Sequence, residues 1–277
     1  MITVNPDKPL ANCDWPKRTD DTRIPIYKGV KHQGPGDHPG TGTPQSVHGG
    51  GGTAVAPNGD PIPESYRDLI SDAIKYDVHV PLINNPHIRV AIEPDVAGRM
   101  TKKDFALMEK MIEEADSFNL PPVTVLRDIY FIGPSEMTLL TGSSTVLGAY
   151  SPTEQSIVIQ FEGTRDDDYL AKDAIGVARE PIDVIAHEIG HAMHAAEPNN
   201  VFDRALAMRG SFSPNQLTDA KTHAMVARVV SKYASIMPVE FVAEVFSGIR
   251  RGNEYDGTIM EIYEDFGGPK PPSQRGK

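Results

Sequence analysis

The chain contains a single cysteine, Cys13, among its 277 residues. One cysteine cannot form a disulfide within the chain, and it cannot supply the several thiolates of a cysteine-based structural metal site. Any metal ion held by this protein must therefore be bound mainly through histidine, aspartate or glutamate side chains.

Basic residues are also scarce, since 27 lysines and arginines stand against 38 aspartates and glutamates. The formal net charge is -11 and the isoelectric point is about 5.3. A nucleic-acid-binding surface needs a basic patch to neutralise phosphates, so this composition argues against nucleic acid as a partner. The negative charge is more simply explained as a contribution to solubility.

Long hydrophobic runs are absent, and no stretch of the sequence is apolar enough over sufficient length to span a bilayer. The N-terminus lacks the basic and then apolar pattern of a classical secretory signal. The sequence is therefore compatible with a cytoplasmic, virion-associated or non-classically exported protein. With 39% hydrophobic and 23% charged residues, the composition is that of an ordinary globular protein.

Residues 1–62 differ in composition from the remainder of the chain. Glycine and proline crowd the stretch from Gly29 to Pro63, which includes a run of glycines at 49–52. Such a segment buries too little apolar surface to offset the entropy lost on ordering. We therefore expect residues 1–62 to form an extended arm or linker, and residues 63–277 to form one folded domain.

The pattern of the folded domain predicts an α+β fold, with a small mixed sheet followed by a helical half. Alternating apolar residues at Ile88, Val90 and Ile92 predict one strand, and Thr101 with Asp104 marks the start of one amphipathic helix. The predicted strands are 88–92, 128–132 and 156–161, with a strand or loop at 146–150. The predicted helices are 63–77, 101–118, 181–196, 201–208, 213–235, 238–248 and 258–266.

The most specific local pattern is His187-Glu188-Ile189-Gly190-His191, within the helix predicted at 181–196. Residues four apart lie above one another on a helix face, so His187 and His191 can direct their imidazoles at one ion. Glu188 is rotated by one residue and can take a proton from a metal-bound water. The pattern H-E-x-x-H is typical of zinc metallopeptidases.

A catalytic zinc site commonly uses three protein ligands, and the sequence offers several candidates for the third. His194 follows His187 by seven residues, nearly two turns along the helix, which is too far to share the ion. Glu197 follows His187 by ten residues, but His194 stands where the chain would need a glycine to turn back. Glu240, on a later predicted helix, is the preferred candidate.

Glu240 and Glu244 lie four residues apart on a predicted helix that is otherwise largely apolar and begins at Pro238. Burying two carboxylates on such a helix is costly unless a cation or another partner compensates them. One carboxylate can bind zinc, and the other can accept a hydrogen bond from a ligand histidine and fix its tautomer. Asp183, four residues before His187, can brace that histidine or favour the helix N-terminus, and we prefer the second role.

Together with the H-E-x-x-H segment, the pattern Tyr233-x6-Glu240-Phe241-x-Ala243-Glu244 resembles the zincin metallopeptidases represented by the anthrax lethal factor catalytic domain. It is similar also to related bacterial proline-specific endopeptidases. The resemblance implies a zincin-like fold, with Glu240 as third zinc ligand and Tyr233 as transition-state stabiliser. Glu244 would then be the carboxylate that hydrogen-bonds a ligand histidine from behind. Its specific motifs cover about residues 180–252. Met237 stands where a polar helix cap is expected.

Two functions follow as expectations. The first is a zinc endopeptidase with one zinc ion and a peptide or protein substrate, in which Glu188 activates the zinc-bound water. An extended substrate would then lie along the strand or loop at 146–150. The second is a structural component of a virion or secretion apparatus, in which residues 1–62 bind neighbouring subunits.

Overall fold

The computed structural model describes residues 55–57, 59–164, 176, 178, 180–207 and 220–270. Residues 1–54, which hold Cys13 and most of the predicted arm, lie outside these ranges. The first part of the helix predicted at 213–235 lies outside them as well. Within the described residues, the chain forms the expected α+β fold with a mixed five-stranded sheet.

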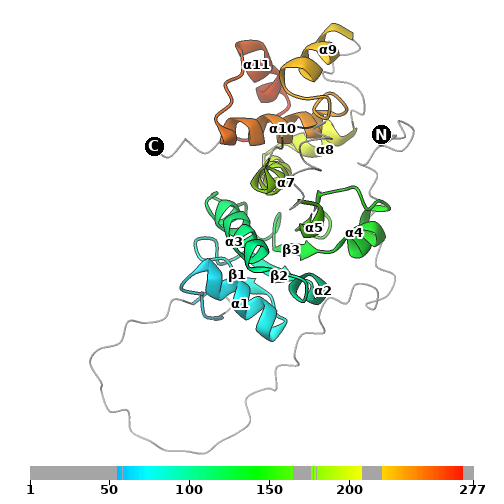
Figure 1. The fold of residues 1–277 in the computed structure, drawn as a ribbon. Helices are drawn as coiled ribbons and strands as arrows, with labels where there is room; N and C mark the ends of the chain where they lie inside the picture. The colour runs from blue at the N-terminus through cyan, green and yellow to red at the C-terminus, as the bar shows by residue number, and fades with distance from the viewer. Residues whose placement is uncertain are drawn as a thin grey trace, which may run out of the picture.

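The sheet forms one layer of the molecule (Figure 1). Its three inner strands run parallel to one another, and both edge strands run antiparallel to their neighbours. In spatial order the strands are β1 (Val80–Pro81), β2 (Arg89–Ile92), β3 (Asp128–Ile132), β5 (Ser156–Gln160) and β4 (Gly148–Ser151). The strands predicted at 88–92, 128–132 and 156–161 are thus confirmed, and the segment at 146–150 contributes the edge strand β4.

The amphipathic helix α1 (Tyr66–Tyr76) packs on β1 and β2, and a second amphipathic helix, α3 (Lys102–Asp116), packs on α1. The capping box predicted for α3 is present, because Thr101 and Asp104 exchange side-chain and backbone hydrogen bonds. A separate cluster is formed by α4 (Pro134–Thr141), whose buried side chains pack against Ile132 and Val158. Short helices α2 (Pro94–Ala97) and α5 (Phe161–Thr164) complete this half.

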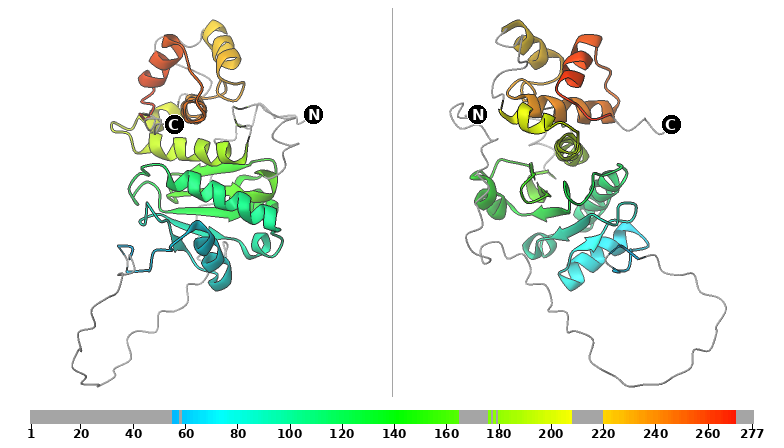
Figure 2. Two further views of the ribbon diagram at one scale, coloured as in Figure 1. Left: turned by 60° about the vertical axis from the view of Figure 1, so that its left-hand side comes forward. Right: turned by 180° about the vertical axis from the view of Figure 1, so that it is seen from behind.

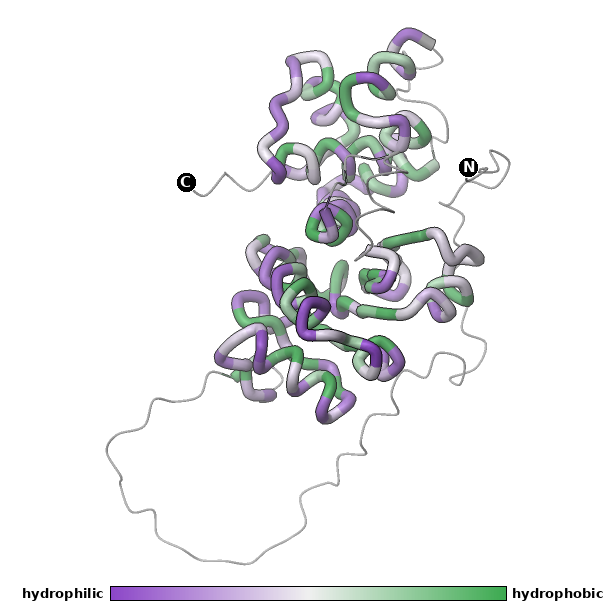
Figure 3. Tube along the Cα trace, viewed as in Figure 1, coloured by the Kyte–Doolittle hydropathy of each residue, from purple (hydrophilic) through white to green (hydrophobic). Residues whose placement is uncertain are grey.

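Helix α7 (Pro181–Ala195) lies between the sheet and the helical half, as the two further views in Figure 2 show. It packs on β4, β5 and α3 on one side and on α8 and α10 on the other. A helix in contact with two layers must be apolar over much of its surface. Ile185 and Ile189 are accordingly fully buried, while the same helix carries hydrophilic residues as well (Figure 3).

The helical half contains α8 (Val201–Ala207), α9 (Ala220–Val229), α10 (Pro238–Arg251) and α11 (Gly257–Asp265). Helix α10 approaches α7 closely at Gly190, where an added Cβ atom would lie 3.2 Å from Ala243 Cα. Glycine at this position therefore permits the two helices to meet with little space between their backbones. None of the helices in the described residues combines the length and hydrophobicity needed to cross a membrane.

The prediction that one helix runs on to Ser235 is wrong, because α9 ends at Val229 and turns follow at residues 230 and 232–236. We call residues 230–237 the turn segment. Within it, the Ser231 hydroxyl accepts a hydrogen bond of 2.9 Å from the Ala234 backbone N–H. A serine that bonds the local backbone in this way competes with helical hydrogen bonding. Met237 is extended, as expected for a residue that precedes a proline.

Candidate metal centre

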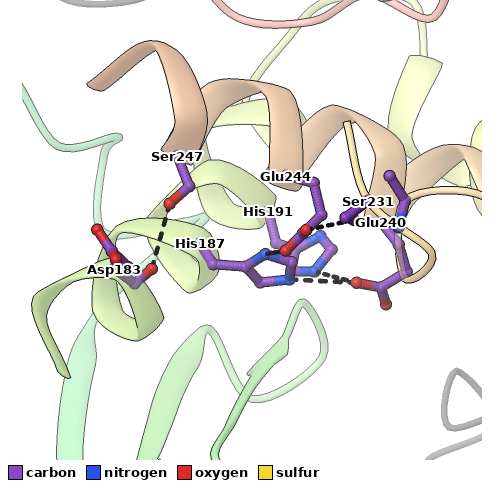
Figure 4. Close-up of polar contacts among 8 residues, drawn as sticks. Asp183, His187, His191, Ser231, Glu240, Glu244 and Ser247 are labelled. Carbon is purple, nitrogen blue, oxygen red and sulfur yellow. Dashed lines mark hydrogen bonds and ion pairs between the residues drawn. The ribbon is translucent and has the colours of Figure 1, made fainter. Parts of the chain in front are cut away.

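The predicted site residues come from three segments of the chain. His187, Glu188 and His191 lie on α7, Glu240 and Glu244 lie on α10, and Tyr233 lies in the turn segment. Figure 4 shows the two histidines facing the two glutamates across the space between α7 and α10. The packing of these helices thus brings together residues that are about fifty positions apart in the sequence.

His187, His191 and Glu240 each direct one ligand atom to a common point, and these atoms lie within 4.8 Å of one another. Glu240 Oε2 is 3.1 Å from His187 Nε2 and 3.3 Å from His191 Nε2. All three residues are at most 9% exposed. Among the described residues, this is the only group of three or more such side chains that meets these distance limits.

Glu244 lies behind His187, with Oε1 2.9 Å from the Nδ1 atom of the imidazole. When Nδ1 carries the hydrogen and donates it to this carboxylate, Nε2 presents its lone pair towards the point shared with His191 and Glu240. A carboxylate in this position fixes the tautomer and the orientation of a histidine ligand. The geometry therefore matches the supporting role predicted for Glu244.

The charges of the centre are strongly coupled. Burial alone would raise the pKa of Glu240, but the adjacent His191 and His187 lower it below its ordinary value. Burial alone would lower the pKa of His187, but its contacts with Glu240 and Glu244 raise it well above its ordinary value. The centre thus favours a charged Glu240 and a positive charge beside it, which either a proton or a metal ion can supply.

Glu188 is also buried, and its Oε2 atom has no hydrogen-bond partner among the described residues. Burial raises the pKa of this carboxyl group, although His187 and His191 partly oppose the shift. On the sheet side it meets the edge strand, because a Cβ atom added to Gly148 would lie 2.7 Å from Glu188 Oε1. Glycine in β4 therefore leaves the space that this carboxylate occupies.

The Tyr233 ring lies against the centre, with its centroid 5.9 Å from that of His187. Burial, together with the negative charges of Glu240, Glu188 and Glu244, raises the pKa of the phenol well above its ordinary value. The hydroxyl consequently stays protonated at neutral pH and remains a hydrogen-bond donor.

The donor set fits a zinc ion, since two imidazole nitrogens and one carboxylate oxygen are ligands that zinc accepts in catalytic sites. Like Glu188 Oε2, the His191 Nδ1 atom is buried without a hydrogen-bond partner among the described residues. The same contacts also form a buried ion-pair network when His187 is protonated. The zinc site and the ion-pair network differ in whether a metal ion is bound, and metal content can be measured directly.

The alternative third ligands do not join this group. His194 Nε2 is 2.9 Å from the Phe266 backbone oxygen, which agrees with the expectation that His194 is too distant to share the ion. Glu197 is not a member of the ligand group either. Asp183 accepts hydrogen bonds from the Glu180 backbone N–H and from Arg251, so it favours the start of α7, and Glu244 supplies the brace for His187.

One residue of the centre was not predicted from the sequence. Ser231, which is buried, donates a hydrogen bond of 2.6 Å from its hydroxyl to Glu244 Oε2. A single sequence carries no signal that sets this serine apart from the others, because its contact depends on how the turn segment folds back against α10.

Comparisons with protein-family models, with curated proteins and with solved structures find no match to this chain.

His194 gives a prediction for stability. Burial, with a smaller contribution from His191, lowers its pKa to about 4 from the ordinary value of 6.5. Between these two pH values the unfolded chain binds a proton that the folded chain does not, so the free energy of unfolding falls as the pH falls from 6.5 to 4. The full loss is about 3 kcal/mol.

We expect His194→Gln to make this pH dependence shallower, as measured by urea unfolding with excess chelator present. Equal slopes for wild type and His194→Gln would refute this explanation.

Proposed function

We propose that this protein is a zinc-dependent endopeptidase. The observation that carries the proposal is the convergence of His187, His191 and Glu240 on one point, with Glu188 buried beside it. The resemblance of the same residues to the zincin metallopeptidases supports the same reaction. When bound, zinc would supply Lewis acidity, which polarises a carbonyl group and lowers the pKa of water.

Glu188 has the environment of a general base and acid. Its raised pKa brings proton uptake and release closer to neutral pH, where transfer in both directions is efficient. The carboxylate would accept a proton from the attacking water and later give it to the leaving amine. Its Oε2 atom, which has no partner among the described residues, is available for this transfer.

Tyr233 would stabilise the negative charge that develops on the carbonyl oxygen during attack. Its raised pKa keeps the hydroxyl in the donor form throughout the reaction. A positioned donor of this kind is worth most where water is largely excluded, as it is beside the buried His187 and Glu240 side chains.

The edge strand β4 offers a place for the substrate. Within the part of the chain that the structure describes, it pairs only with β5, so its other edge would be the one to receive an extended peptide as an additional strand. Gly148 at the start of β4 meets the Glu188 carboxylate, which puts this strand next to the reacting groups. A peptide bound there would have its backbone near Glu188.

The first test concerns metal content. We expect purified wild type to bind about one zinc ion per chain, measured by elemental analysis after dialysis. Glu240→Ala should lose most of this zinc, because it removes one of the three donors. Glu197→Ala is the matched control and should keep the wild-type content. Wild type without specific zinc, or equal loss in both variants, would contradict the proposal.

The second test concerns the chemistry. Glu188→Gln keeps the shape of the side chain but cannot accept a proton, so it should retain zinc and lose at least about a hundredfold in kcat. Cleavage of a library of short peptides, analysed by mass spectrometry, measures this loss whichever peptide bond the enzyme prefers. Full activity in the variant would rule out the role of Glu188.

A further inference from the structure

The hydroxyl of Ser231 contacts both the turn segment and Glu244 on α10. It donates to Glu244 Oε2 at 2.6 Å and accepts from the Ala234 backbone N–H at 2.9 Å. The other oxygen of the same glutamate lies 2.9 Å from His187 Nδ1. One continuous line of hydrogen-bonding contacts thus runs from the turn segment through Ser231 and Glu244 to a candidate ligand.

Tyr233 lies inside the turn that this contact closes, between Ser231 and Ala234. The turn is not part of a helix, so its conformation depends on side-chain contacts and on packing. The Ser231 hydroxyl both closes the turn and joins it to α10. Tyr233 is therefore connected to the histidine through the line of contacts as well as through its own ring contact.

The orientation of the Glu244 carboxylate depends on the Ser231 hydroxyl. The glutamate is only 2% exposed, and a buried carboxylate needs donors for both of its oxygens. His187 serves Oε1 and Ser231 serves Oε2. Loss of the serine donor would leave the carboxylate less fixed and would therefore weaken its hold on the histidine.

We propose that Ser231 is a positioning residue that couples the placement of Tyr233 to the orientation of His187 through the shared carboxylate of Glu244. The inference rests on the proposed function for the role of Tyr233, but its effect on metal affinity is independent of any peptidase activity. It adds to the centre a residue that touches neither the metal nor the substrate.

The experiment measures zinc affinity by competition with a chromogenic chelator in wild type and in Ser231→Ala. Removing a residue that supports a metal ligand typically weakens metal affinity about tenfold or more, and we expect a loss of about tenfold here. Ser231→Thr keeps the hydroxyl and should restore most of the affinity. At saturating zinc, Ser231→Ala should lower kcat with little change in KM, because Tyr233 acts mainly in the transition state.

Ser235 provides the matched control. It is a buried serine of the same turn segment, and its hydroxyl donates to the Lys232 backbone oxygen at 2.8 Å. Ser235→Ala therefore removes a hydroxyl hydrogen bond of the same segment that does not involve Glu244, and its zinc affinity should match that of wild type. Urea unfolding of each variant without metal separates loss of affinity from loss of folding.

A double-mutant cycle decides whether Ser231 acts through Glu244. In the Glu244→Gln background, Ser231→Ala should cause little further loss of zinc affinity. A full additional loss in that background, or equal affinities for Ser231→Ala and Ser235→Ala, would overturn the inference while leaving the proposed function intact. If wild type binds zinc normally but cleaves no peptide, the proposed function is contradicted. The coupling of Ser231 to His187 through Glu244 can still be measured as zinc affinity in that case.

Discussion

The close packing of α7 against α10 is the constraint on which the candidate centre depends. Gly190 lets the helices approach until an added Cβ atom would lie 3.2 Å from the Ala243 backbone. The approach places Glu240 Oε2 within 3.3 Å of both histidines. At the far end of α10, Arg251 contacts Asp183 at 2.8 Å and fixes the start of α7 to the same helix. Small shifts in this interface would separate the ligand atoms, since packed helices have little room to adjust.

The electrostatics of the centre follow from the same packing. Three carboxylates and two imidazoles share a region from which most solvent is excluded. Carboxylates buried together are costly unless positive charge is present, so the centre favours either protonated histidine or a bound cation. Two opposite shifts result, because the pKa of Glu240 is lowered by the histidines while that of Glu188 is raised by burial. Under the proposed function, two glutamates in one centre would thereby be suited to different roles, a ligand and a proton carrier.

Much of the fold could be predicted from the sequence, because its cues are local. The capping box at Thr101 and the apolar alternation of Ile88, Val90 and Ile92 each depend on residues close together in the chain. The H-E-x-x-H helix was predicted for the same reason. The four-residue spacing of Glu240 and Glu244 on an apolar helix indicated the two carboxylates that face the histidines. Residues 230–235 of the turn segment were predicted wrongly as helix, because the hydrogen bonds of Ser231 that replace the helical pattern depend partly on α10. The edge-strand position of β4 likewise depends on sheet pairing, which periodicity alone does not define.

A crystal structure with anomalous diffraction data collected at the zinc absorption edge tests the account most directly. One anomalous peak is expected, bonded to His187 Nε2, His191 Nε2 and an oxygen of Glu240 at about 2.0–2.2 Å. Glu244 and Ser231 should keep their contacts behind His187 in that structure. Direct hydrogen bonds from the histidines to Glu240 in zinc-containing crystals, with no peak between them, would contradict it and leave the cluster as a structural ion-pair network.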